Sequence, residues 1–186
     1  MERMNEQMFD ISQFGPRLGT RLEGEKARAR LVAAIEALPR DGRIIISLQG
    51  IDVLSGSFAD EVIGKAYQGL VAGLYEERTM ILRTPSLELT DDLAHKLERR
   101  KLAMLCLANG RWSLLGQYGP ELEETLDLII ERKTTTARDL AAVLNIAMNT
   151  CANRVARLAH LRLIVREQIG MNGPQPVYQL HSILDS

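Results

Sequence analysis

Residues 136–180 read TARDLAAVLNIAMNTCANRVARLAHLRLIVREQIGMNGPQPVYQL, and this stretch decides how the C-terminal part of the chain folds. Thr136 and Asp139 have the spacing of a capping box, so a short helix is predicted to begin there. Asn145 can adopt the left-handed backbone that ends such a helix. A second helix is predicted over about 148–161, because apolar side chains recur there at helical spacing.

The flanking segments complete a pattern of three helices and a hairpin. Pro120 suits the first turn of a helix. The apolar stripe of this helix consists of Leu122, Leu126, Ile129 and Ile130. Strands are predicted over 164–167 and 177–180, with the loop 170–176 between them.

The helix predicted over 148–161 offers polar groups on one face. If Cys151, Val155 and Leu158 turn inward, five polar residues share the opposite face. These are Asn149, Thr150, Asn153, Arg154 and Arg157. Asparagine can pair with adenine edges, and arginine with guanine or phosphate. Arg138, in the preceding helix, is a candidate phosphate contact. The alternative is that the arginines only solvate a surface helix.

Residues 120–183 resemble the winged helix-turn-helix of bacterial transcriptional regulators, through DLAAVLNI, RVARLAHL, RLIVRE and the closing VYQL. The resemblance implies an α+β domain over 118–186 that binds double-stranded DNA. A homodimer is expected, because one recognition helix reads only a few base pairs, and the stripe that follows Pro120 is a candidate seam. The wing tip, 171–173, has no Arg or Lys, unlike many wings. Some winged helices bind protein instead, so both alternatives stay open.

Residues 1–117 alternate between amphipathic helices and short apolar runs, which indicates an α/β layer domain. The predicted strands are 7–11, 44–48, 80–82 and 102–107, and the predicted helices are 25–38 and two that begin at Ser57 and Thr90. The run 44–48 suits a strand that is buried on both faces, so helices are expected above and below the sheet. Asn109-Gly110 between two apolar runs predicts a hairpin.

The segments RLGTRLEG (17–24) and SGSFADEVIG (55–64) resemble the STAS-like family of unknown function, over about residues 7–117. The order of the predicted elements is that of the STAS domain, the fold of bacterial anti-sigma factor antagonists. In antagonists of this type, a GHKL-type kinase phosphorylates a Ser or Thr in the loop between strand and helix. The loop offers Ser55 and Ser57 but lacks the order Asp-Ser-Ser-Gly. The resemblance implies a sensing or protein-interaction domain whose partner is a kinase or an anti-sigma-like protein.

The two serines also have a purely physical interpretation. A serine at a helix start is well placed for a phosphate, because free N–H groups and the helix dipole stabilise an anion. It is equally well placed to cap the helix. Ser57, three residues before Asp60, is interpreted as the cap. For Ser55 both interpretations stay open, and it is the preferred phosphorylation candidate.

Net charge divides unevenly along the chain. The segment from Arg132 to the C-terminus carries a net charge of +4, and residues 1–131 carry −5. A basic part joined to an acidic part is expected when one domain meets phosphates and the other does not. A difference of this size also arises by chance, so it supports DNA binding only together with the helix face.

The sequence shows no pattern of a catalytic or metal site. His95, His160 and His181 lack the spacing of metal ligands, and no GxSxG, Walker A or GxGxxG motif occurs. We therefore expect a protein that is not an enzyme, with no catalytic residue, metal or cofactor. Cys106 and Cys151 lack CxxC spacing, which favours reduced thiols over a disulfide or a metal pair.

Location and function follow as expectations. No apolar run reaches the roughly 18 residues of a membrane span, and no signal-peptide core follows residues 1–6. A cytoplasmic protein without a membrane partner is expected. Its expected function is that of a DNA-binding transcriptional regulator with an N-terminal STAS-like domain. The alternative is a STAS-type interaction switch whose winged helix also binds protein.

Overall fold

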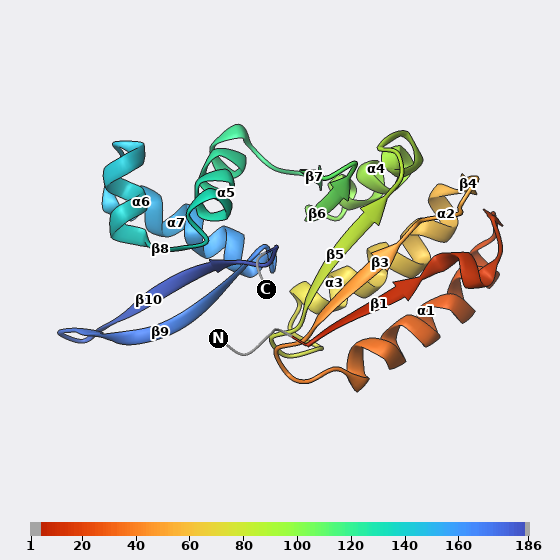
Figure 1. Ribbon diagram of the computed structural model, residues 1–186, viewed down its shortest axis with the longest axis horizontal. Coiled ribbons are helices and arrows are strands. Elements are labelled where there is room, and N and C mark those ends of the chain that lie inside the picture. Colours follow the sequence, from red (N-terminus) through yellow and green to blue (C-terminus); the bar gives the residue numbers. More distant parts are fainter. Residues whose placement is uncertain (1–4, 185–186) are drawn as a thin grey trace. The chain divides into compact units, whose positions relative to one another are not determined.

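The computed structural model describes residues 5–184 and divides into two compact units, Met1–Gln117 and Tyr118–Ser186 (Figure 1). The division falls at Tyr118-Gly119-Pro120, where the pattern of the sequence also changes. Asp185, which contributes to the charge of the C-terminal segment, lies outside the described residues. Among the helices formed by residues 5–184, none is both long enough and apolar enough to span a membrane.

The N-terminal unit is built on a five-stranded, mostly parallel sheet in the order β1-β3-β5-β6-β7. Its strands are β1 (Glu6–Asp10), β3 (Arg43–Ser47), β5 (Thr79–Thr84), β6 (Ala103–Ala108) and β7 (Arg111–Gly116). The predicted hairpin is confirmed, because β6 and β7 pair antiparallel through Asn109 and Gly110, both at positive φ. The α/β class expected for this part of the chain is confirmed at that level.

Three helical segments lie side by side on one face of this sheet. Each parallel crossover moves one strand further in the same direction, and right-handed crossovers that do so place their helices on the same face. The contacts agree, since α1 (Arg21–Ala37) and α4 (Asp91–Arg99) both pack against the segment between them. The prediction that the run 44–48 is buried on both faces is confirmed, since every residue of β3 is buried, but the expectation that helices cover both faces is wrong.

Helix α1 begins four residues earlier than predicted, because Thr20 and Glu23 form a capping box. The Thr20 hydroxyl accepts from the backbone N–H of Glu23 at 3.2 Å, and the Glu23 carboxylate accepts from the backbone N–H of Thr20 at 3.1 Å. The hydrogen bonds from Thr20 lower the pKa of Glu23. The helix buries Gly24, Ala27, Leu31 and Ile35.

The next helical segment consists of α2 (Gly56–Ala59), a π-helical turn η2 (Asp60–Gly64) and α3 (Lys65–Val71). The prediction that Ser57 caps it is wrong. Ser55 is the N-cap, and its hydroxyl accepts from the Phe58 N–H at 3.1 Å. The cause is tertiary: β4 (Val53–Leu54) pairs with β2 (Arg17–Leu18), so the chain leaves that strand pair and enters the helix at Ser55.

Helix α4 begins next to Thr90, as predicted, but without a side-chain cap. Thr90 precedes the helix, but its hydroxyl donates to the Leu87 carbonyl at 2.6 Å, inside the short turn η3 (Glu88–Thr90). A threonine hydroxyl that bonds backward to a carbonyl leaves the helix N–H groups to other partners.

The C-terminal unit contains the three predicted helices and hairpin, together with one strand that was not predicted. The elements are α5 (Pro120–Arg132), β8 (Thr134–Thr136), α6 (Ala137–Leu144), α7 (Met148–His160), β9 (Ile164–Asn172) and β10 (Gln175–Ser182). Strand β8 pairs with β10, which makes a sheet of order β8-β10-β9. The loop predicted over 170–176 is mostly strand, since only Gly173 and Pro174 lie between β9 and β10.

Several local predictions for this unit are confirmed. Thr136 caps α6 by accepting from the Asp139 N–H at 3.2 Å, and Asn145 ends it with φ 52° and ψ 47°. The predicted inward residues of α7 are buried: Cys151, Val155, Leu158 and Leu161. Leu122, Leu126 and Ile129 of the candidate seam are buried within the unit, and Ile130 is half-buried, so the stripe is used mainly inside the unit. Cys106 and Cys151 are free thiols, and burial raises the pKa of the Cys106 thiol to about 12.

The finding that Ser55, and not Ser57, caps α2 gives a testable prediction. Ser55→Ala removes the helix cap and the 2.8 Å hydrogen bond to the Gly19 carbonyl. We expect it to lower the free energy of unfolding by about 1 kcal/mol. Ser57 is exposed, so Ser57→Ala should change it by less than about 0.5 kcal/mol. Urea unfolding followed by the fluorescence of Trp112, the only tryptophan, reports the N-terminal unit. Equal losses for the two variants would contradict the assignment.

Candidate functional site

Helix α7 presents a polar face opposite its buried one. Cys151, Val155 and Leu158 are buried, and at 3.6 residues per turn the opposite side faces water. The exposed residues include the predicted Asn149, Thr150, Asn153 and Arg157. The structure adds Ala152, Ala156 and His160, which were not assigned to this face, although the helical spacing from Asn149 and Asn153 contains that signal. Two small residues on such a face permit close approach to a ligand.

Arg154 does not share this face. Its Nη1 lies 3.3 Å from the Glu124 carboxylate and 3.3 Å from the Glu121 carbonyl, and the side chain is 18% exposed. Thr125 on the same helix is 3.4 Å away. The expectation that Arg154 points outward with the other polar residues is wrong. Its position on the flank of α7 turns it toward α5, so it joins two helices of the unit.

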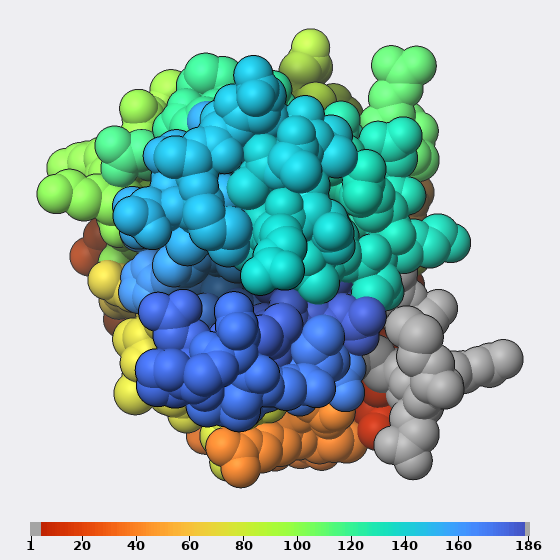
Figure 2. All heavy atoms as spheres, turned by 90° about the vertical axis from the view of Figure 1, so that its left-hand side faces the viewer, coloured from red at the N-terminus to blue at the C-terminus, as the bar shows by residue number. Residues whose placement is uncertain are grey.

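Arg138 lies in the first turn of α6 and is exposed. The neighbouring acid, Asp139, is engaged by the Thr136 hydroxyl at 2.7 Å. Figure 2 looks onto the surface where α6 and α7 lie side by side, in cyan and light blue, next to the darker β9–β10 hairpin. The sequence-predicted candidates on α6 and α7, except Arg154, are therefore all exposed on a pair of packed helices.

Charge is segregated within the C-terminal unit. Helix α5 carries five acids (Glu121, Glu123, Glu124, Asp127 and Glu131) and a single arginine at its last position. From Ala137 to Asn172, five arginines face two acids. The unit as a whole carries seven Lys or Arg and eight acids, a net charge of −1, so the expectation of a basic domain is wrong and the positive excess is confined to the part that follows the acids of α5. Such segregation favours an anionic partner on that side.

The tip of the β9–β10 hairpin is apolar instead of basic. Ile169 and Met171 are 53% and 59% exposed. The nearest hairpin cation, Arg166, stacks on the ring of Tyr178 at 5.1 Å, below the tip. Exposed apolar side chains without cations suit contact with a protein surface, or with the bases inside a DNA groove, better than contact with the phosphate backbone.

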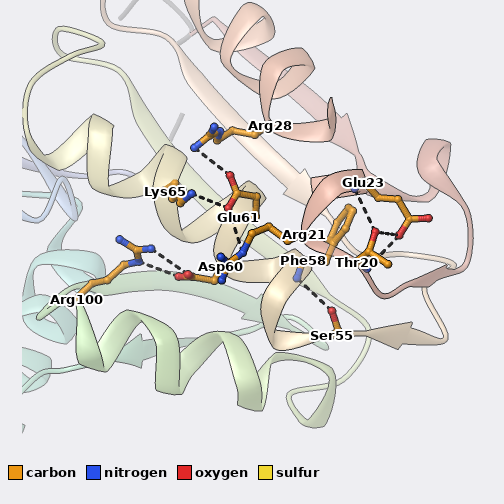
Figure 3. Close-up of polar contacts among 10 residues, drawn as sticks. All are labelled: Thr20, Arg21, Glu23, Arg28, Ser55, Phe58, Asp60, Glu61, Lys65 and Arg100. Atoms are coloured by element: carbon orange, nitrogen blue, oxygen red, sulfur yellow. Dashed lines mark hydrogen bonds and ion pairs between the residues drawn. The ribbon is translucent and has the colours of Figure 1, made fainter. Parts of the chain in front are cut away.

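The two candidate serines lie in different environments: Ser55 is the N-cap of α2 (Figure 3), and Ser57 is the second residue of that helix. Ser55 is half-buried, and its hydroxyl both donates to Gly19 and accepts from Phe58. A phosphate ester at Ser55 would lose that donor, and Asp92 packs directly beside Gly56. Ser57 is exposed. Ser57 is therefore the more accessible of the two serines.

A cluster that the sequence analysis missed lies further along the same helix. The Glu61 carboxylate is 2% exposed and lies 2.6 Å from Lys65 Nζ, 3.2 Å from Arg28 Nη1 and 4.0 Å from Arg21 Nε. Asp60 instead binds Arg100 at 2.8 Å and 3.0 Å. The hydrogen bond from Arg100 lowers the pKa of Asp60. Only the i, i+4 pair of Glu61 and Lys65 could have been found from spacing.

Residues 5–184 contain no group of three or more His, Cys, Asp or Glu side chains placed to hold a metal ion. In comparisons with known proteins, no family model matches this chain and no curated protein shows significant similarity to it. The functional assignment therefore depends on the geometry described above.

The contacts of Arg154 predict a structural effect. Arg154→Ala removes an ion pair and two hydrogen bonds between α7 and α5, so we expect α7 to lose about 1 kcal/mol of local stability. Native-state hydrogen exchange of the α7 amides measures this loss. The exposed Asn153→Ala is the matched control and should stay within about 0.5 kcal/mol of the parent. Unchanged exchange in Arg154→Ala would refute the role.

The pKa of Asp60 predicts a pH dependence. Arg100 lowers this pKa in the folded state, so folding favours the carboxylate. The contribution of the Asp60–Arg100 pair to the free energy of unfolding is therefore complete at pH values above the ordinary pKa of 3.8. It is lost as the pH falls through the lowered value. Asp60→Asn should therefore destabilise the N-terminal unit at pH 7, and the difference from the parent should shrink below pH 3.8. Urea titrations read by Trp112 fluorescence measure it, with the exposed Asp52→Asn as the control.

Proposed function

We propose that this protein is a DNA-binding transcriptional regulator whose C-terminal unit is a winged helix-turn-helix, with α7 as its recognition helix. One observation carries the proposal: α7 is buried through Cys151, Val155 and Leu158 and exposes Asn149, Asn153 and Arg157 on the other side. The major groove admits an α-helix, and these side chains match its donors and acceptors. Ala152 and Ala156 leave room for close approach to the groove edges.

The other elements support the same proposal. Arg138, in the first turn of the exposed helix α6, is the candidate phosphate contact. The acids of α5 belong to the helix that holds α7 from behind through Arg154, so they favour an orientation in which α6 and α7 meet the phosphates. A homodimer on paired half-sites remains the expected assembly. Leu122, Leu126 and Ile129 are buried within the unit, so the proposed dimer would use other residues for its seam.

In this proposal the N-terminal unit is a STAS-like domain that receives a signal from a regulatory protein. Its order of elements and its mostly parallel sheet support that proposal. The candidate contact surface is the segment from Asp52 to Phe58, which leads into the first turn of α2, where α/β folds expose polar groups for partners. Ser57 replaces Ser55 as the candidate for phosphorylation, because Ser57 is exposed and Ser55 is half-buried.

The DNA proposal is tested on the full chain by fluorescence anisotropy. The candidate specific duplexes are taken from the DNA that flanks the gene, and duplexes of random sequence serve as the non-specific comparison. We expect affinity to fall steeply between about 50 and 200 mM salt. Arg138→Ala should lower the salt slope by about one on both duplexes. Asn153→Ala should weaken only the specific complex, by about 1–3 kcal/mol. Arg40→Ala, an exposed arginine of the N-terminal unit, is the control.

Two results would overturn the proposal. The first is the absence of duplex binding even at the lowest salt. The second is an equal loss for Asn153→Ala on specific and random DNA, which would show that α7 does not read bases. In that case the exposed Ile169 and Met171 favour a second candidate, a winged helix that binds protein through the hairpin tip.

A further inference from the structure

Four charged side chains from two helical segments converge on one place in the N-terminal unit (Figure 3). Arg21 and Arg28 come from α1, Glu61 from the π-helical turn η2, and Lys65 from the start of α3. Figure 3 shows the three cations arranged around the Glu61 carboxylate, which is almost completely buried. Single-turn π-helices in proteins occur frequently at functional sites.

The sequence of α1 is adapted to this arrangement. Arg21, Gly24 and Arg28 lie on one face of the helix, since they are three and four residues apart. A Cβ atom at Gly24 would lie 2.9 Å from the Cβ of Glu61 and 3.1 Å from its Cγ, too close for any side chain. Glycine at this position therefore lets the carboxylate lie beneath α1, between the two arginines.

The charges of the cluster do not balance. One carboxylate neutralises one of three cations, so the four residues together carry a net charge of +2. The nearest acid along η2, Asp60, is held by Arg100 on the other side of the segment. The side chains of Arg21, Arg28 and Lys65 are 70%, 35% and 39% exposed, so all three are accessible from solvent.

Neutralising Glu61 does not require all three cations. Lys65 and Arg28 contact the carboxylate directly, whereas Arg21 Nε is at 4.0 Å and the side chain is mostly exposed. Because the Arg21 side chain is 70% exposed, solvent screens its attraction to Glu61 at this distance, and the pair contributes little to stability. Arg21 is therefore placed beside two anchored cations without being needed to hold the buried acid.

We propose that Arg21, Arg28 and Lys65, positioned by the buried Glu61, form a binding site for the phosphate group of a small molecule. The net charge of +2 matches a phosphate dianion, and the planar forks of two arginines suit the bidentate recognition of its oxygens. Glu61 is a positioning residue: it holds two of the cations in place before the ligand arrives. This site is separate from the DNA interface proposed for the C-terminal unit.

The test is a titration of the full-length protein with inorganic phosphate, followed by the ¹⁵N–¹H shifts of the Gly24 and Glu61 amides at constant ionic strength. We expect saturable shifts with a Kd of about 1 mM or lower. Arg21→Gln should weaken phosphate binding at least about tenfold and leave the melting temperature unchanged. Arg40→Gln, whose arginine pairs loosely with Glu77 at 3.8 Å, is the matched control and should bind as the parent does.

Further arms identify the ligand and separate this proposal from the previous one. If ATP binds more tightly than phosphate and shifts the same amides, the ligand is a nucleotide. Equal affinity for ATP and phosphate indicates that only the phosphate group is recognised. Acetate should not compete with phosphate for the site. Arg138→Ala should keep full phosphate binding even where it weakens DNA binding. The proposal is overturned if phosphate produces no saturable shift at these amides up to about 10 mM. Wild-type phosphate affinity in Arg21→Gln overturns it equally.

Discussion

The parallel sheet of the N-terminal unit imposes the constraint on which its other features depend. Because successive strands are added in one direction through right-handed crossovers, α1, the α2–α3 segment and α4 must pack against one another on the same face. The middle segment then has a neighbouring helix on each side. Its adjacent carboxylates divide between them: Asp60 binds Arg100 at the end of α4, and Glu61 binds Arg28 on α1.

The π-helical turn affects the directions in which Asp60 and Glu61 point. A regular α-helix places adjacent residues 100° apart, and the wider turn over Asp60–Gly64 changes their directions at that point. Glycines at both contacts, Gly24 and Gly64, leave no Cβ in the way of the carboxylates. A buried carboxylate is costly unless it is paired, and here the pairing comes from cations on two elements. The same interaction joins the helices and concentrates positive charge at the surface.

In the C-terminal unit the corresponding constraint acts on α7, which is held in place on two of its sides. Its apolar residues pack inward, its flank is held to α5 by Arg154, and its outer face is polar. A helix held on two sides presents its third side in a fixed orientation. The DNA recognition proposed for α7 would require such an orientation, because base contacts depend on side chains that are already in place when DNA binds.

Local sequence was sufficient wherever a feature depends on neighbouring residues. The Asn109-Gly110 hairpin, the left-handed Asn145, the Thr136 cap and the buried face of α7 all follow from turn chemistry and helical periodicity. The polar candidates on that face follow from the same periodicity, apart from Arg154. Its angular position on the flank was visible in the sequence, but the acids of α5 that attract it lie about 30 residues away.

Tertiary structure decided the features that depend on partners distant in sequence. Ser55, and not Ser57, caps α2 because a strand pair with residues 17–18 brings the chain to the helix there. Strand β8 forms because β10, more than 40 residues later, supplies its hydrogen bonds. Glu61 becomes the centre of a cationic cluster because crossover handedness places α1 beside it. Periodicity indicates which face of an element is buried, but only the assembled fold determines which charges meet, because electrostatic partners are selected by distance in space.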